Sequence, residues 1–278
     1  MNMFFFIAQH TMAFMIPLMI VALGGLFAEK SGVVNIALEG KMIMGAFTGI
    51  LFISTFQDRL PGQPILIFGL IVAMVTGVGV SLFHAYAAIN LKANQIISGI
   101  AINMFAPAFA IYVSRLITGT QNVHFINQFR IESVPVFGSI PLIGAMLFQN
   151  TYITTFLGFV ILAASSFVLF RTKFGLRLRA CGEHPQAADS VGVSVVKMRY
   201  AGVLLSGALA GMGGLIYIVP ITTVFSGSVS GYGFLALAVL IFGGWRPGRI
   251  LFAAFFFGVM QTIASSYAAL DFLRVLEI

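Results

Sequence analysis

Three polar residues interrupt an apolar stretch near the N-terminus, GVVNIALEGKMIMGAFTG at 32 to 49. They are Asn35, Glu39 and Lys41, and two of them are charged. Asn35 and Glu39 are four residues apart, so in a helix they share a face. Charges inside a membrane are rare and by default serve a path for solutes or ions. The structural alternative is that Glu39 ties two helices together or pairs with Lys41, while Lys41 can also extend its ammonium to the interface.

The sequence offers little for catalysis. It has no phosphate loop of the form G-x-x-x-x-G-K-[ST], no H-E-x-x-H and no G-x-S-x-G nucleophile elbow. The four histidines show no spacing that indicates a metal site, and they are His10, His84, His124 and His184. We therefore expect neither an enzyme nor a resident cofactor or metal.

Composition indicates an integral membrane protein. Hydrophobic residues make up 59% and charged residues 8% of the 278 residues, against roughly 25% charged in soluble domains. The apolar runs are continuous and lack the alternation of membrane strands. We predict an all-α, polytopic helix bundle forming one domain over 1–278. About eight hydrophobic segments are expected, at 11–28, 33–56, 64–90, 95–118, 150–170, 200–219, 233–243 and 250–268.

The distribution of basic residues predicts the orientation. Six of the 15 basic residues lie between 171 and 199, and by the positive-inside rule this loop is cytoplasmic. The N-terminus and the polar segment at 119–149 then lie outside, and Asn35 and Glu39 lie near the cytoplasmic end of their segment. With Glu183 and Asp189 as its two acidic residues, this loop contributes +4 of the net charge of +7. The placement of the charge indicates topology, so we expect membrane lipid rather than nucleic acid as the partner.

Two further patterns predict architecture. Small residues recur at helical spacing, at Gly45 and Gly49 and again at Gly207, Gly211 and Gly214, which lets helix backbones approach closely in lipid. Ser31 and Gly32 indicate a break just before Asn35. The stretch at 220–234 contains Pro220, several glycines and hydroxyl residues, which predicts a second broken segment, re-entrant on the outer side.

The cytoplasmic loop contains a short helix over about 184–191. Pro185 suits its first turn, Glu183 its positive end, and Gly192 the position just past its end. Ala187 and Ala188 give this helix a face of little bulk that fits a groove on another protein. A helix this short needs such a partner to hold it.

The sequence R-A-C-G-E-H-P-Q-A-A-D-S-V-G at 179–192 resembles the coupling loop of ABC importer permeases. The stretches at 31–46, 94–103 and 231–248 resemble permeases for ribose-like sugars, branched-chain amino acids and nucleosides, most closely the nucleoside branch. The resemblance covers most of the chain between 24 and 258. It implies one last helix beyond the end of this chain.

The resemblance implies a permease subunit of an ATP-driven nucleoside importer in the bacterial cytoplasmic membrane. Its partners would be a cytoplasmic ATPase, which binds the ATP, a second and different permease chain, and an extracytoplasmic substrate-binding protein. The implied contacts to the ATPase are Glu183, Pro185, Ala187, Ala188 and Gly192, and the implied translocation pathway contains Asn35, Glu39, Asn103 and Phe234. For Asn103 the structural alternative is a hydrogen bond between helices.

Three other functions remain open. The first is a permease for simple sugars such as ribose. The second is a stand-alone secondary transporter or channel, which should not need a long basic loop with a docking helix. The third, and most distant, is an intramembrane enzyme.

Overall fold

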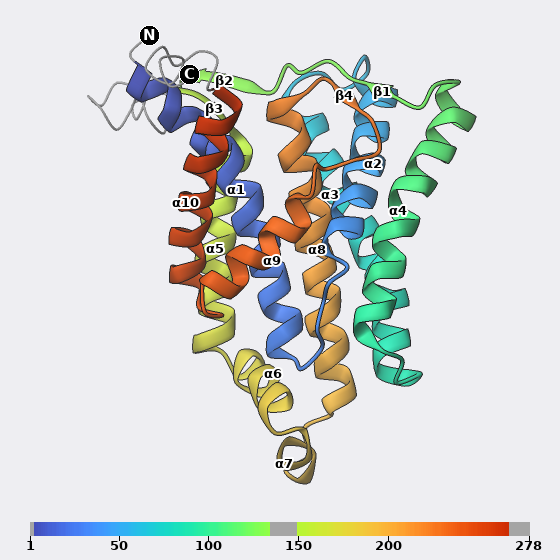
Figure 1. The fold of residues 1–278 in the computed structure, drawn as a ribbon, viewed down its shortest axis with the longest axis vertical. Coiled ribbons are helices and arrows are strands. Elements are labelled where there is room, and N and C mark those ends of the chain that lie inside the picture. Colours follow the sequence, from blue (N-terminus) through green and yellow to red (C-terminus); the bar gives the residue numbers. More distant parts are fainter. Residues whose placement is uncertain (1–2, 134–148, 267–278) are drawn as a thin grey trace, which may run out of the picture.

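The computed structural model describes residues 3–133 and 149–266, and within them the chain is a bundle of long helices (Figure 1). The predicted helical fold class is confirmed. Among the described residues, six helices are long and apolar enough to cross a membrane. They are α1 (Met3–Lys30), α3 (Gln63–Ala85, continued by the π-helical turn η1, Tyr86–Asn90), α4 (Gln95–Thr118), α5 (Ile153–Arg171), α8 (Val195–Ile221) and α10 (Pro247–Ser266).

Two other predicted segments also form helices, of 19 and 11 residues. These are α2 (Leu38–Phe56) and α9 (Tyr232–Phe242), and neither is among the six. The irregular stretch at 31–37 precedes α2 and climbs beside α1, so α2 begins about halfway up the bundle (Figure 1). Glu39 thus lies in the first turn of its segment, as expected, but this beginning is about halfway along the bundle and not at its end, because an extended chain covers more height per residue than a helix.

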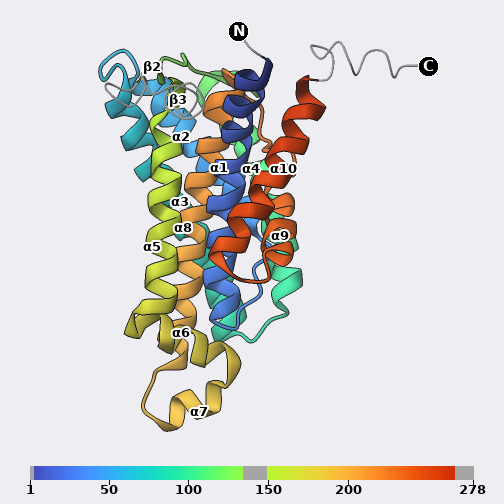
Figure 2. The same ribbon diagram turned by 90° about the vertical axis from the view of Figure 1, so that its left-hand side faces the viewer.

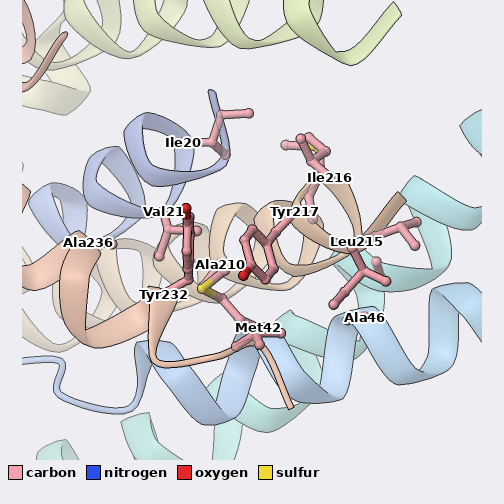
Figure 3. Close-up of a cluster of buried hydrophobic side chains, with 14 of the residues drawn as sticks. Ile20, Val21, Met42, Ala46, Ala210, Leu215, Ile216, Tyr217, Tyr232 and Ala236 are labelled. Carbon is pink, nitrogen blue, oxygen red and sulfur yellow. The ribbon is translucent and has the colours of Figure 1, made fainter. Parts of the chain in front are cut away.

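The core lies where α8 packs against α1, α2 and α3. Most of the surface of α1 and α8 is buried, whereas α4 and α10 expose most of theirs, as helices that meet lipid do. Between α1, α2, α8 and α9 lies an apolar cluster that includes Val21, Met42, Tyr217 and Tyr232 (Figure 3). The rings of Tyr217 and Tyr232 are 3.8 Å apart between centroids.

Glycines allow this close packing. Gly45 of α2 faces the backbone of Gly211 on α8, and Gly77 of α3 faces the backbone of Gly207. A Cβ atom added to any of these four residues would overlap backbone atoms of the neighbouring helix, and one at Gly214 would overlap α2. The predicted role of these glycines in close helix approach is confirmed.

Short strands close one end of the bundle. They form two antiparallel pairs, in which β1 (Val123–His124) pairs with β4 (Val224–Phe225), and β2 (Arg130–Ser133) pairs with β3 (Gln149–Tyr152). This end contains the described part of the predicted outer segment; residues 134–148 lie outside the described part. From β4 the chain descends to α9, which also begins about halfway along the bundle (Figure 1).

The opposite end carries α6 (Lys173–Glu183) and α7 (Pro185–Ser190). Both extend beyond the bundle (Figure 2). The predicted short helix at 184–191 is confirmed as α7, with Pro185 in its first turn and Gly192, at φ +81°, just past its end.

Candidate functional site

Glu39 links the beginnings of two helices that are distant in sequence. One carboxylate oxygen accepts a hydrogen bond from the amide of Gly231 at 2.9 Å and the other from Gly233 at 2.6 Å. The first amides of a helix have no partner within it, and a negative charge there is favoured by the helix dipole. Glu39 thus caps α9 from the first turn of α2.

Two parts of our expectation for Glu39 are decided by this geometry. Its side chain is 7% exposed, so its predicted position in the protein interior is confirmed, as is a tie between helices. Within the described part of the chain it bonds at α9 and not to Lys41, so of the two structural alternatives the tie between helices holds and the pairing with Lys41 does not.

Lys41 and Asn35 form a second buried contact. The Lys41 ammonium donates to Asn35 Oδ1 at 2.8 Å, and Asn35 Nδ2 donates to Ser206 Oγ on α8 at 2.6 Å. All three side chains are fully buried. The expectation that Lys41 reaches the interface is therefore wrong, because its stem runs toward Asn35 in the interior.

Asn103 holds the beginning of α2 from the side of α4. Its Oδ1 accepts from the amide of Gly40 at 2.8 Å, and its Nδ2 donates to the carbonyl of Ile36 at 2.9 Å. The helix-to-helix hydrogen bond considered for Asn103 is confirmed. It joins the Asn103 side chain to two backbone groups that have no helical partner, because the chain breaks between α1 and α2 at 31–37.

Sequence reasoning missed two residues of this site. Gln95 Oε1 accepts from the amide of Val34 at 2.7 Å, and His84 Nε2 lies 3.2 Å from the carbonyl of Val34. The other ring nitrogen of His84 lies 3.0 Å from Ser98 Oγ. His84 looked like one of four scattered histidines, and the only sequence signal for Gln95 was its place in the motif at 94–103.

Together these side chains satisfy an irregular backbone inside the bundle. Unpaired backbone groups at membrane depth are tolerated only where protein or water meets them. Side chains of α3 and α4 meet Val34, Ile36 and Gly40, while Asn35 reaches α8. The described residues contain no cluster of three His, Cys, Asp or Glu side chains that would hold a metal.

Phe234 lies beside this site with a side chain that is half exposed. It follows Gly233 in the first turn of α9, yet its side chain is 50% exposed. Asn35, Glu39 and Asn103 therefore converge on the beginning of α2, whereas the Phe234 ring lies on the surface of the described chain.

The coupling loop differs from expectation at its alanines. Ala187 is exposed but Ala188 is 3% exposed, so the two do not share an outward face. Ala188 is buried because α7 packs back on α6 and α8. Glu183 is exposed and ends α6, one residue before the cap of α7.

The coupling loop also touches the break before α2. Gly182 of α6 packs on the backbone of Lys30 and Gly32, so closely that a Cβ atom on it would overlap the Lys30 carbonyl. Gly32 has φ +84°, a conformation that favours glycine. At the same end, the indole of Trp245 donates a hydrogen bond to the Glu29 carboxylate.

The comparisons with known proteins agree with a transport role. Residues 7–276 match the family described as branched-chain amino acid transport system, permease component. The chain is 45% identical over 260 residues to the guanosine ABC transporter permease protein NupQ of Bacillus subtilis strain 168, covering 93% of this chain and 81% of the relative.

Two other relatives are similar along most of the chain. The nucleoside ABC transporter permease protein NupC of Lactococcus lactis subsp. cremoris is 38% identical over 263 residues, covering 93% of this chain and 81% of the relative. The putative glucose ABC transporter permease protein TsgC13 of Haloferax volcanii is 31% identical over 254 residues, covering 88% and 73%. No solved structure matches. The chain therefore belongs to this permease family, as a non-catalytic, multi-pass membrane component of an ABC transporter.

Proposed function

We propose that this permease imports nucleosides, with guanosine as the first substrate to test. The observation that carries the proposal is the 45% identity, along 93% of this chain, to a guanosine permease protein. A nucleoside permease protein at 38% supports it. The second candidate is a simple sugar such as ribose or glucose, because a putative glucose permease protein is 31% identical.

The proposed translocation pathway includes Asn35, Glu39, Asn103 and Phe234. Three of these meet where α2 begins halfway along the bundle, and polar residues at that depth are typical of transport paths. We count eight membrane segments by adding α2 as a seventh and α9 as a re-entrant eighth. Under this count the chain is a single permease domain, 1–278, with its cytoplasmic loop at 171–199.

We propose that the loop couples ATP hydrolysis on a partner ATPase to transport. Five residues are assigned to this contact, namely Glu183, Pro185, Ala187, Ala188 and Gly192. Glu183, at the end of α6, and Ala187, on α7, are exposed and would contact the ATPase directly. Ala188, Pro185 and Gly192 would instead shape α7, which presents Ala187. A movement of α7 would be transmitted to the irregular stretch before α2, because Gly182 of the neighbouring α6 packs on Gly32.

The remaining partners follow from the family. An ABC permease works with an ATPase and a substrate-binding protein; here we propose a cytoplasmic ATPase at α7 and an extracytoplasmic binding protein at the end closed by the strands. A second permease chain, different from this one, would complete the pathway. ATP would bind to the ATPase alone.

The experiment that tests the substrate is competition. Cells that depend on this transporter take up labelled guanosine in the presence of excess unlabelled nucleoside, ribose or glucose. We expect nucleosides to compete and both sugars to leave uptake unchanged. Uptake of labelled glucose or ribose, without uptake of guanosine, would replace the nucleoside proposal with the sugar proposal.

A further inference from the structure

The connection between β4 and α9 exposes a row of hydroxyl groups. Along residues 226–230, side chains alternate between exposed and buried. Ser226, Ser228 and Ser230 are exposed, whereas Gly227 and Val229 are buried. The three serines therefore face outward while Gly227 and Val229 lie against the protein, along a backbone that bends at Gly227 (φ +79°) and turns at Ser230 (φ +55°).

This row lies at a depth where lipid is a poor neighbour. It descends from the strand end of the bundle to the beginning of α9 halfway along it (Figure 1). Irregular backbone does not face lipid within the hydrocarbon region, and is tolerated where it lines a cavity or meets protein. The exposed face of the row must therefore meet water, substrate or another protein chain.

Two of the hydroxyl groups have capacity to bind a ligand. The Ser226 hydroxyl bonds to none of the residues that the structure describes. Ser228 Oγ accepts from the amide of Ser230 at 3.0 Å, which leaves its own proton available to donate. A serine hydroxyl both donates and accepts, so these two side chains suit a ligand that carries hydroxyl groups.

An aromatic ring lies at the inner end of the row. Phe234 is 50% exposed, and its position is fixed because Glu39 bonds to Gly231 and Gly233 immediately before it. Exposed aromatic rings bind nucleobases by stacking without regard to base identity.

We propose that Ser226, Ser228 and Phe234 form a substrate contact in the import path, in which the serines bond to sugar hydroxyls and the Phe234 ring stacks on the base. This rests on the proposed nucleoside function and names where the two halves of a nucleoside bind. The alternative is that a second permease chain covers this row of serines. The labelling experiment below distinguishes a bound nucleoside from a covering chain.

The first test is cysteine labelling in the assembled transporter. Single cysteines replace Ser226, Ser228 or the control Phe167, an exposed residue of α5, in a Cys181→Ser background, and a membrane-impermeant thiol reagent is added outside. We expect the cysteines at 226 and 228 to react at least about tenfold faster than the cysteine at 167. Addition of guanosine together with its binding protein should lower the reaction rates at 226 and 228. Equal reaction rates at all three positions, or no protection by guanosine, would contradict the proposal.

The second test concerns the ring. Phe234→Leu should lower guanosine uptake about tenfold, equivalent to about 1.4 kcal/mol, while Phe234→Tyr and the control Phe167→Leu keep it. Normal uptake by an assembled Phe234→Leu transporter would overturn the stacking contact. A parent transporter that imports only sugar would overturn the nucleoside function itself, and labelling protected by that sugar would still support the serine contact.

Discussion

Glu39 in the first turn of α2 bonds to the amide of Gly233 in the first turn of α9 at 2.6 Å, although 194 residues separate them in sequence. The two helices begin about halfway along the bundle (Figure 1), so a charged side chain holds two breaks against each other. A change in this contact would alter both breaks together. The hydrogen bonds of Glu39 to α9 explain why this apolar segment retains a carboxylate.

Substitution of Glu39 separates its structural role from a role in transport. Glu39→Leu removes both acceptors and leaves two amides of α9 unpaired, at about 1–3 kcal/mol each. Glu39→Gln keeps one acceptor and the shape. Thermal unfolding in detergent and guanosine uptake should be measured on both variants.

We expect Glu39→Gln to assemble with a modestly lowered unfolding temperature and to transport slowly. Glu39→Leu should lose folded protein. If uptake falls only in proportion to folded protein in both variants, Glu39 is a structural tie and not part of the pathway. A well-folded Glu39→Leu protein with normal uptake would contradict both roles.

Asn103→Leu tests the second support of α2. The substitution leaves the Gly40 amide and the Ile36 carbonyl without their partner, so we expect a loss of about 1–3 kcal/mol in the free energy of unfolding. Met104→Leu, at the exposed neighbouring position, is the control and should change stability little. Equal unfolding curves for the two variants would show that Asn103 does not hold the break.

Gly182→Ala tests transmission from the coupling loop to the break. Its Cβ atom would overlap the Lys30 carbonyl, so α6 must move away from the end of α1. We expect ATP hydrolysis to continue while guanosine uptake falls severalfold. Gly79→Ala, where a Cβ atom meets nothing within 4 Å, is the control, and uptake falling equally in both variants would argue against a specific path.

Ala187→Trp tests the docking face of α7. Because Ala187 is exposed, a large ring there should obstruct an ATPase groove without disturbing the loop, so we expect loss of the ATPase in co-purification. Ala188→Trp would instead disrupt the loop, because Ala188 is buried. Normal co-purification and transport by Ala187→Trp would place the ATPase contact elsewhere.

Local signals in the sequence predict much of this architecture. Hydropathy identifies the six long apolar helices of the described residues, and Pro185 with Gly192 brackets α7 correctly. Glycine spacing likewise predicts a close approach of helices, which Gly45 and Gly211 make, but not which helices meet. In each case the information lies within one segment of the chain.

The site depends on contacts between distant segments, which such signals do not contain. Nothing near Glu39 in sequence indicates that its partners are Gly231 and Gly233. Lys41 is buried because the irregular stretch at 31–37 places the beginning of α2 about halfway along the bundle. His84 likewise acquires its partner Val34 only through folding.

The most direct measurement is uptake by proteoliposomes that contain this permease, its partner permease and the ATPase. With the loaded binding protein outside and ATP at the ATPase face, labelled guanosine should accumulate above its external concentration. Vesicles without ATP, or without the ATPase subunit, should not accumulate it. Equal guanosine levels with and without ATP, or accumulation without the ATPase, would contradict an ATP-driven nucleoside importer.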